Sequence, residues 1–368
     1  MKTRPLIKRW NLSRLALGAL VPCLTGYTLV AAADSDQSEQ EAFDRYFGLK
    51  NSPSDDNDWT THFRIGAVVG LNISAKFNEN AMFSLNSSKG TYDDGYVRSD
   101  STGSPDGLTW NWGYDNASQY NAAAQTLTFH HTTSYTPNDS GSQVAGGPFP
   151  GFDLEYGGNI YKWDSFHIGW DLGFDLLPMN ISDNSSMSAS VTQITYTFKT
   201  GTMIPPGPGY QGGYNGPGPL LPTTGTSSPP ETGLAGNVSG SRSLDMMLYA
   251  IRLGPTFTWD FTKDFSASLG IGPAMGIVSA EYKYDETIST ASSTTRSSGS
   301  FTGLDVVFGG DVNATLLYHM QDKGQPVDLY LSAQYMPLGS ADFSQGGRDG
   351  RVDLSGQVYI SAGVNWAF

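Results

Sequence analysis

The chain has 368 residues, of which 15% are charged and 12% aromatic, and its formal net charge at pH 7 is −14. A chain this acidic is poorly suited to binding nucleic acid. Its one cysteine, Cys23, lies in an N-terminal leader, so we expect no disulfide and no cysteine metal site in the mature chain.

Residues 1–33 predict a secretory signal peptide. Basic residues precede an apolar stretch from Leu15 to Val30, and Ala31-Ala32-Ala33 offers a small-residue cleavage site. We therefore expect cleavage near Ala33. A membrane-anchor helix is the alternative, which Pro22 disfavours because it interrupts an already short run. Residues 34–61 are acidic and polar, and predict a mobile periplasmic segment.

Strict alternation of apolar and polar residues begins at His62. Between residues 62 and 77, every odd position from Phe63 to Phe77 is apolar, and most even positions are polar or glycine. Such a run is longer than the usual strand of about five or six residues. It is long enough to cross a bilayer, which takes about 9–11 tilted residues.

The same alternation recurs along the rest of the chain and predicts eight strands. They cover residues 62–77, 152–160, 166–176, 247–261, 265–277, 304–318, 327–335 and 352–368. In 265–277 the alternation changes phase after Ile277, which is consistent with a β-bulge.

The connections between these strands alternate in length. The short ones are 162–164, 262–264 and 320–325, and the long ones are 78–151, 178–243, 286–300 and 339–350. Short turns at one end and long loops at the other are typical of outer-membrane barrels. For residues 62–368 we predict an all-β, antiparallel, up-and-down transmembrane β-barrel of eight strands, with short periplasmic turns and long extracellular loops.

Alternatives to this prediction remain open. Residues 187–198 also have a strand pattern and are placed in the second long loop; a ten-strand barrel is the alternative if they and a segment near Leu127–Phe129 both span. A large soluble β-sandwich with apolar faces inward is a further alternative. The Pro/Gly-rich segment 204–233 cannot form a ladder, and we expect it to be disordered or polyproline-like.

Aromatic residues of the apolar faces cluster beside the short turns. Amphipathic rings prefer the membrane interface, so the cluster predicts an aromatic girdle. Its predicted members are Trp163, Phe166, Trp259, Phe261, Phe265 and Tyr318.

The opposite faces carry polar, charged and glycine residues, which would fill the lumen. The interior of an eight-stranded barrel is just wide enough for side chains. Unpaired buried charges are costly, so charges in the lumen must pair. We predict that Arg64 and Arg252 are held by some of Glu155, Asp171 and Asp311.

No catalytic or cofactor motif stands out. The histidines are His62, His130, His131, His167 and His319, and no local hydrolase signature surrounds any of them. His130-His131 in the first long loop could bind a metal, although a solvated pair is the commoner reading. There is no Walker loop and no dinucleotide fingerprint. We therefore expect no enzyme activity, no cofactor and no metal site.

The end of the chain resembles that of the bacterial outer-membrane β-barrel superfamily, whose small eight-stranded members include the OmpA transmembrane domain and OmpX. The resemblance rests on the stretch "YISAGVNWAF", in which Phe368, Trp366, Val364 and Ile360 match the terminal pattern of that superfamily. The resemblance implies that these residues form a signal read by the barrel assembly machinery. The chain stops at Phe368, so no OmpA-type peptidoglycan-binding domain is expected.

The predicted location is the outer membrane of a Gram-negative cell, in contact with its lipid and lipopolysaccharide after export by the secretion machinery. The first functional hypothesis is a structural or surface-interaction role, in which the loops bind an extracellular glycan or protein. Porin-like passage of ions or small solutes is the alternative, and eight strands with paired lumen charges argue against it. A membrane-embedded hydrolase is a remote third hypothesis, which requires a histidine beside a serine at the outer rim.

Overall fold

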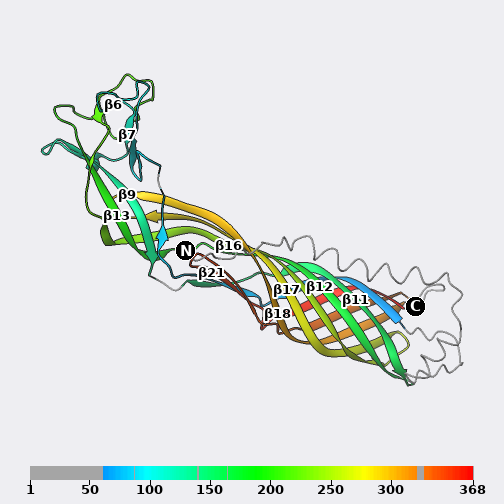
Figure 1. The fold of residues 1–368 in the computed structure, drawn as a ribbon. Helices are drawn as coiled ribbons and strands as arrows, with labels where there is room; N and C mark the ends of the chain where they lie inside the picture. Colours follow the sequence, from blue (N-terminus) through cyan, green and yellow to red (C-terminus); the bar gives the residue numbers. More distant parts are fainter. Residues whose placement is uncertain (1–60, 87, 139–140, 164, 321–326, 368) are drawn as a thin grey trace, which may run out of the picture. The chain divides into compact units, whose positions relative to one another are not determined.

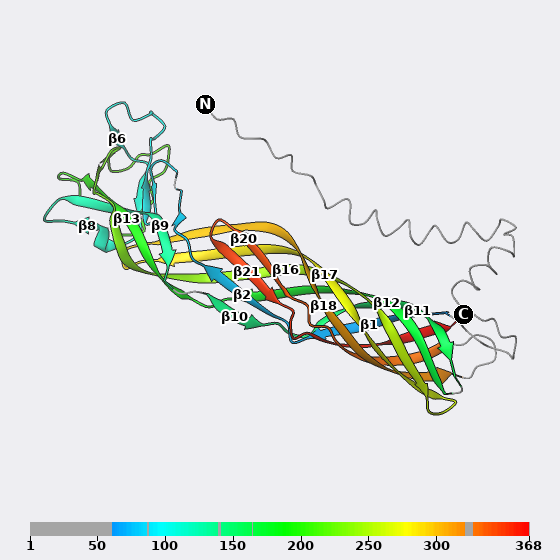
Figure 2. The same ribbon diagram turned by 60° about the horizontal axis from the view of Figure 1, so that its bottom comes forward.

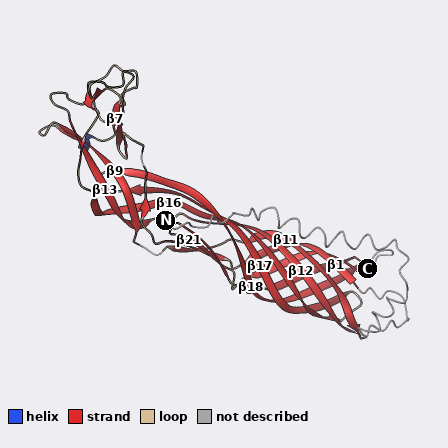
Figure 3. Cartoon of the chain, in the orientation of Figure 1, coloured by secondary structure: helices blue, strands red, loops and turns tan. Residues whose placement is uncertain are grey.

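The computed structural model describes residues 61–367 except 87, 139–140, 164 and 321–326. The predicted signal peptide, residues 34–60 of the predicted periplasmic segment, and Phe368 lie outside the described residues. Almost all regular structure is β-strand (Figures 1 and 3). Within the part of the chain described, no helix is long and apolar enough to cross a membrane.

Eight antiparallel strands form a closed hydrogen-bonded ring. Their order around the ring is β1, β11, β12, β16, β17, β18, β19, β22 and back to β1, with the β12–β16 pair closing it. The strands are β1 (Thr61–Leu71), β11 (Phe149–Lys162), β12 (Phe166–Asp183), β16 (Glu231–Asp260), β17 (Phe265–Ser289), β18 (Thr294–Met320), β19 (Val327–Tyr335) and β22 (Val358–Ala367).

The ring has two distinct ends. At one, which we call the turn end, β11 is joined to β12 and β16 to β17 by short turns, and β1 begins and β22 ends. At the other, the loop end, the chain forms the remaining strands between β1 and β11 and between β12 and β16. These are β2 (Ser74–Glu79), β3 (Phe83–Ser84), β4 (Thr91–Tyr92), β5 (Gly95–Val97), β6 (Leu108–Thr109), β7 (Trp112–Tyr114), β8 (Tyr120–Asn121), β9 (Thr126–Pro137), β10 (Ser142–Ala145), β13 (Met187–Lys199), β14 (Leu221–Pro222) and β15 (Thr226–Ser227).

Strand boundaries differ from the sequence prediction at the loop end. The first predicted strand is broken into β1 and β2 at Asn72, whose φ of 59° is left-handed and ends the ladder. The last predicted strand is likewise two strands, β21 (Arg348–Asp353) and β22. Strands β2, β10, β20 (Ser340–Gln345) and β21 form a separate four-stranded sheet (Figure 2).

The predicted loop 286–300 is mostly strand. β17 and β18 remain paired as far as Ser289 and Thr294, and a tight turn joins them. The predicted change of phase after Ile277 is wrong: the alternation of inward and outward side chains continues without a shift. What changes there is the chemistry of each face. Val278 and Tyr282 point inward and are buried, whereas Lys283 points outward.

The faces of the ring therefore invert between its two ends. Over the turn-end part, large apolar side chains point outward and are exposed, among them Leu269 at 50% and Phe308 at 70%. Towards the loop end, the interior holds an apolar core that includes Leu177, Leu248 and Tyr359. A barrel wall with an apolar outer face is suited to lipid, and one with an apolar inner face is suited to water outside.

The long loops are folded. Strands β9 and β13 pair with each other, and β13 also pairs with the first residues of β16, so both extend the sheet outside the ring. Residues 187–198 thus lie in an excursion of the second loop, where the sequence analysis put them.

The predicted disorder of 204–233 is wrong. The segment lies against the first long loop: Trp112 Nε1 donates to the Pro219 carbonyl at 2.8 Å, and Tyr96 Oη donates to that of Gly212 at 2.9 Å. Two short ladders also form, β14 with β6 and β15 with β13. Aromatic residues of the partner loop supply the contacts that a proline-rich segment cannot make with itself.

The inversion of faces predicts position-dependent effects of an outward charge on β18. Val312→Arg places a cation on the apolar exterior and should lower the free energy of unfolding in lipid vesicles by about 2–4 kcal/mol. Thr302→Arg lies on the same outward face of the same strand, opposite Glu281. It should change stability by less than about 0.5 kcal/mol. Equal costs in urea titrations of the two variants would contradict the proposed boundary between lipid and water.

Candidate functional site

A buried row of charges crosses four neighbouring strands inside the ring. The register pairs Arg64 on β1 with Glu155 on β11, Glu155 with Gly173 on β12, and Gly173 with Arg252 on β16. The side chains alternate between faces, so this register places all four positions on the inner face. A Cβ at Gly173 would overlap the Arg252 guanidinium, so the glycine leaves the space that this group occupies.

The two arginines share one carboxylate. Arg64 Nη1 hydrogen-bonds to Oε1 of Glu155, and Arg252 Nη2 donates to Oε2 of the same group at 2.9 Å. Arg252 also donates to Asp175 Oδ2 at 2.8 Å and to Asp153 Oδ1 at 3.3 Å. All five side chains are at most 6% exposed. Charge-assisted bonds of this kind offset the desolvation of buried ions.

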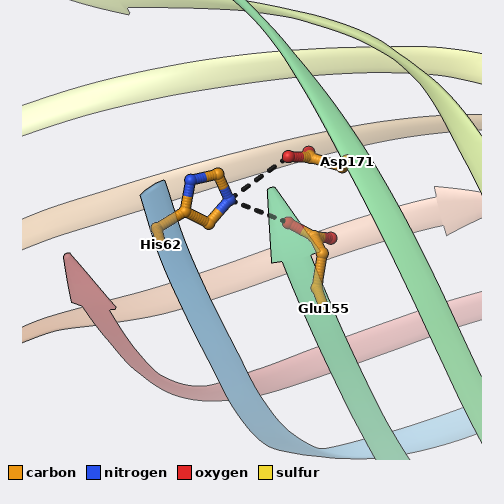
Figure 4. A group of neighbouring side chains, drawn as sticks. All are labelled: His62, Glu155 and Asp171. Carbon is orange, nitrogen blue, oxygen red and sulfur yellow. Dashed lines mark ion pairs between the residues drawn. The ribbon is translucent and has the colours of Figure 1, made fainter. Parts of the chain in front are cut away.

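A second row, nearer the turn end, brings His62 to Asp171. His62 pairs in register with Gly157, and Gly157 with Asp171, so only a glycine separates the two side chains on the inner face. A Cβ at Gly157 would clash with Asp171 Oδ1 and lie 2.8 Å from His62 Cε1. Figure 4 shows the imidazole facing both carboxylates: Nε2 lies 3.2 Å from Asp171 Oδ1 and 3.6 Å from Glu155 Oε1.

The structure thus brings together four of the five residues predicted for the lumen cluster. Asp311 is buried too, but it accepts hydrogen bonds from Asn313 at 2.8 Å and Gln334 at 2.7 Å. Within the described residues, no ion pair joins it to either arginine.

The predicted lumen cluster did not include Asp153, Asp175 or His62. Asp153 also accepts a hydrogen bond from Tyr330 Oη at 2.7 Å. Alternation could have placed all three residues on the inner face. Choosing partners among them required the strand register, which alternation leaves undefined.

The remaining histidines each face a carboxylate. His130 Nδ1 lies 2.6 Å from Asp94 Oδ2, and His167 Nε2 lies 2.9 Å from Asp260 Oδ2. His131 Nδ1 is 3.9 Å from an oxygen of Asp93.

At the turn end, one histidine sits between a serine and an aspartate. His319 Nδ1 is 3.0 Å from Asp328 Oδ1, and its Nε2 is 3.0 Å from Ser266 Oγ. The order serine, histidine, aspartate is that of a hydrolase triad. No local sequence motif marks this arrangement, because the three residues lie on three strands, β17, β18 and β19.

A further charged cluster, absent from the sequence analysis, lies inside the loop end. Arg348 donates to Glu79 at 3.0 Å, to Glu286 at 2.9 Å and to Tyr135 Oη at 2.7 Å. Arg242 Nε lies 3.4 Å from the other oxygen of Glu286. Burial, reinforced by the neighbouring Glu286, raises the pKa of Glu79 to about 7.

The predicted aromatic girdle residues all lie on the outside of the turn end. Their exposed fractions range from 38% at Phe166 to 62% at Trp259. Trp163 stacks on Phe166 with ring centroids 5.7 Å apart, and Phe265 contacts Tyr318 at 5.1 Å. Of the predicted assembly residues, Ile360 and Trp366 are exposed on β22, Val364 is partly buried, and Phe368 lies outside the described residues.

A closed antiparallel ring that turns its apolar side chains outward is the architecture of an outer-membrane β-barrel protein. No protein-family model matches the chain, and no curated protein matches its sequence significantly.

The chain is similar to several solved structures of outer-membrane proteins. They include Ail, the attachment invasion locus protein of Yersinia pestis, in complex with the heparin analogue sucrose octasulfate (8% identity, 83% of this chain, 99% of that chain, TM-score 0.24). Another is the outer-membrane protease OmpT of Escherichia coli (10% identity, 86% of this chain, 99% of that chain, TM-score 0.30). A third is a Pseudomonas aeruginosa FadL homologue (12% identity, 84% of this chain, 90% of that chain, TM-score 0.19). At these identities and TM-scores the likeness carries nothing about activity, and the class rests on the ring and its exterior.

The shared carboxylate network predicts a large cost for removing one arginine. Arg252→Met leaves the carboxylates around it without their cation and should lower the free energy of unfolding by about 3–5 kcal/mol. Arg351→Met is the matched control, because Arg351 is exposed and its Nε is 3.7 Å from Asp342. That variant should lose no more than about 1 kcal/mol. Urea unfolding in detergent measures the free energy of unfolding of both variants. A small loss for Arg252→Met would show that the network contributes little to stability.

Proposed function

We propose that the protein is an eight-stranded outer-membrane barrel with a filled lumen, acting structurally and through its extracellular loop end. The turn end faces the periplasm, and the girdle around it lies at the inner interface of the outer membrane. The signal peptide 1–33 directs export and is cleaved near Ala33, residues 34–61 remain in the periplasm, and the terminal strand is read by the barrel assembly machinery.

The filled interior is the observation that carries this proposal. The lumen contains the row of charges, and towards the loop end Leu177, Leu248 and Tyr359 are fully buried in an apolar core. The cavity beside Asp171 and Arg252 has a volume of about 10 Å³. That is about the space of one water molecule. An interior of this kind argues against the porin-like alternative, which needs a continuous aqueous path.

A polar cavity supports a binding role for the loop end. It has a volume of about 310 Å³, and its lining includes Asn86, Asp93, His131, Arg296 and several hydroxyl side chains. The volume is at the lower limit for small-ligand sites, roughly 300–1,000 Å³. A carboxylate, a guanidinium, an imidazole and hydroxyl groups can hydrogen-bond many hydroxyls at once. This chemistry favours a glycan over an apolar protein segment.

Glycan binding should therefore depend on this cavity. The double variant His131→Gln, Arg296→Gln removes two lining groups and should lower binding to a glycan array at least tenfold, with the barrel intact by its heat-dependent gel mobility. Arg351→Gln, an exposed arginine outside the cavity, is the control and should bind as the wild type does. Unchanged binding by the double variant, or no glycan bound by the wild type, would count against the proposal.

A hydrolase is the second candidate, on the geometry of Ser266, His319 and Asp328. In such a site His319 Nε2 would take the proton of Ser266 Oγ as the oxygen attacks an ester carbonyl, and Asp328 would orient the ring through Nδ1. Ser266 is only 1% exposed, which disfavours this candidate because a substrate must reach Oγ.

Covalent labelling by a fluorophosphonate probe decides the hydrolase candidate. If the triad is active, the folded wild type is labelled and Ser266→Ala is not. If the geometry is only structural, neither protein is labelled. Ser268→Ala is the matched control, because Ser268 is the next inward serine on β17 and is also buried.

A further inference from the structure

We propose that the ring binds one divalent transition-metal ion, with Zn²⁺ as the reference ion, through His62, Asp171 and Glu155. The ligand atoms are Nε2 of His62, Oδ1 of Asp171 and Oε1 of Glu155, which all lie within 4.8 Å of one another (Figure 4). One imidazole nitrogen and two carboxylate oxygens are a common protein ligand set for zinc.

The two separations from the imidazole nitrogen fit a tetrahedral ion. Ligand bonds of about 2.0–2.2 Å place neighbouring donor atoms roughly 3.3–3.5 Å apart. The His62 nitrogen lies 3.2 Å from the Asp171 oxygen and 3.6 Å from the Glu155 oxygen, on either side of that value. Three protein ligands leave a fourth position for water.

Two of the ligand atoms have no hydrogen-bond partner within the described residues. Nε2 of His62 and Oδ1 of Asp171 are buried and lie 3.2 Å apart, within ion-pair distance, but they do not meet the geometry of a hydrogen bond. Asp171 is only 5% exposed, so water does not compensate readily. Burying polar atoms without a hydrogen bond is costly, because their lost hydration is not replaced. An ion bound between them would satisfy both.

The formal charge of the buried side chains around the site also favours a bound cation. Two guanidinium groups, those of Arg64 and Arg252, face four buried carboxyl groups, which leaves a formal excess of two negative charges. The carboxyl groups are those of Asp153, Glu155, Asp171 and Asp175, each no more than 5% exposed. A divalent ion would balance that excess.

The surroundings allow the ion to enter and hold its ligands in place. The His62 side chain is 17% exposed, the most open of the three ligands, and lies at the turn end. Arg64 Nη1 hydrogen-bonds to Oε1 of Glu155, and the second lone pair of that oxygen remains for a metal. Gly157 leaves the space in which His62 and Asp171 approach each other.

Zinc binding to the untagged full-length protein, refolded in detergent, tests the proposal. Folding is verified by gel mobility that shifts on heating, and binding is measured by isothermal titration calorimetry with Zn²⁺. We expect one ion per chain, and at least tenfold weaker binding for His62→Gln and for Asp171→Asn. His167→Gln is the matched control, because its imidazole faces the single carboxylate of Asp260; it should bind zinc as the wild type does.

Absence of zinc binding by the folded wild type would overturn the proposal, as would unchanged affinity in His62→Gln. If the variants fail to fold, the wild type alone decides the question. Its unfolding temperature should be higher with Zn²⁺ than with EDTA. An unchanged temperature would also overturn the proposal.

Discussion

The backbone hydrogen bonds of the eight strands must close into a ring before this chain can cross a membrane. Lipid offers no hydrogen-bond partner, so a sheet can cross a membrane only if it has no free edge. The β12–β16 pair supplies that closure over a long register, from Phe166 opposite Trp259 to Asp183 opposite Arg242. With the backbone satisfied, the outward side chains are free to be apolar, and the inward ones must satisfy each other.

The interior meets that requirement with charge and then with apolar packing. Towards the turn end, Arg64 and Arg252 share Glu155, and glycines at 157 and 173 leave room for the larger groups across the ring. Further along the same strands the exterior becomes polar, and the interior holds the apolar core. The same chain is thus packed in two opposite ways, because its outer solvent changes from lipid to water along the strands.

Alternation in the sequence was enough to place the membrane strands and their outward faces. The girdle positions followed as well, because aromatic residues beside short turns need no partner to be recognised. Pairings such as His62 with Asp171 depend on register, which is set by contacts between strands distant in sequence. After Ile277 the apolar residues change from the outer face to the inner face, because the surroundings of the strand change from lipid to water. A search for outward apolar residues cannot distinguish this change from a bulge.

The order of the long loops was not predicted from the sequence. Proline-rich segment 204–233 has no periodicity of its own, and its order comes from contacts with Tyr96 and Trp112 of the other long loop. Likewise, Ser266, His319 and Asp328 carry no local motif, because they meet only across three strands. Long-range contacts of this kind are properties of the tertiary structure.

Single-channel conductance in a planar bilayer tests whether the closed ring has a filled lumen. The sample is refolded protein whose folded state is verified by gel mobility that shifts on heating. The folded protein should insert without discrete current steps, because the row of charges and the apolar core block an aqueous path. Reproducible steps of fixed size would contradict it and would favour passage of ions or small solutes.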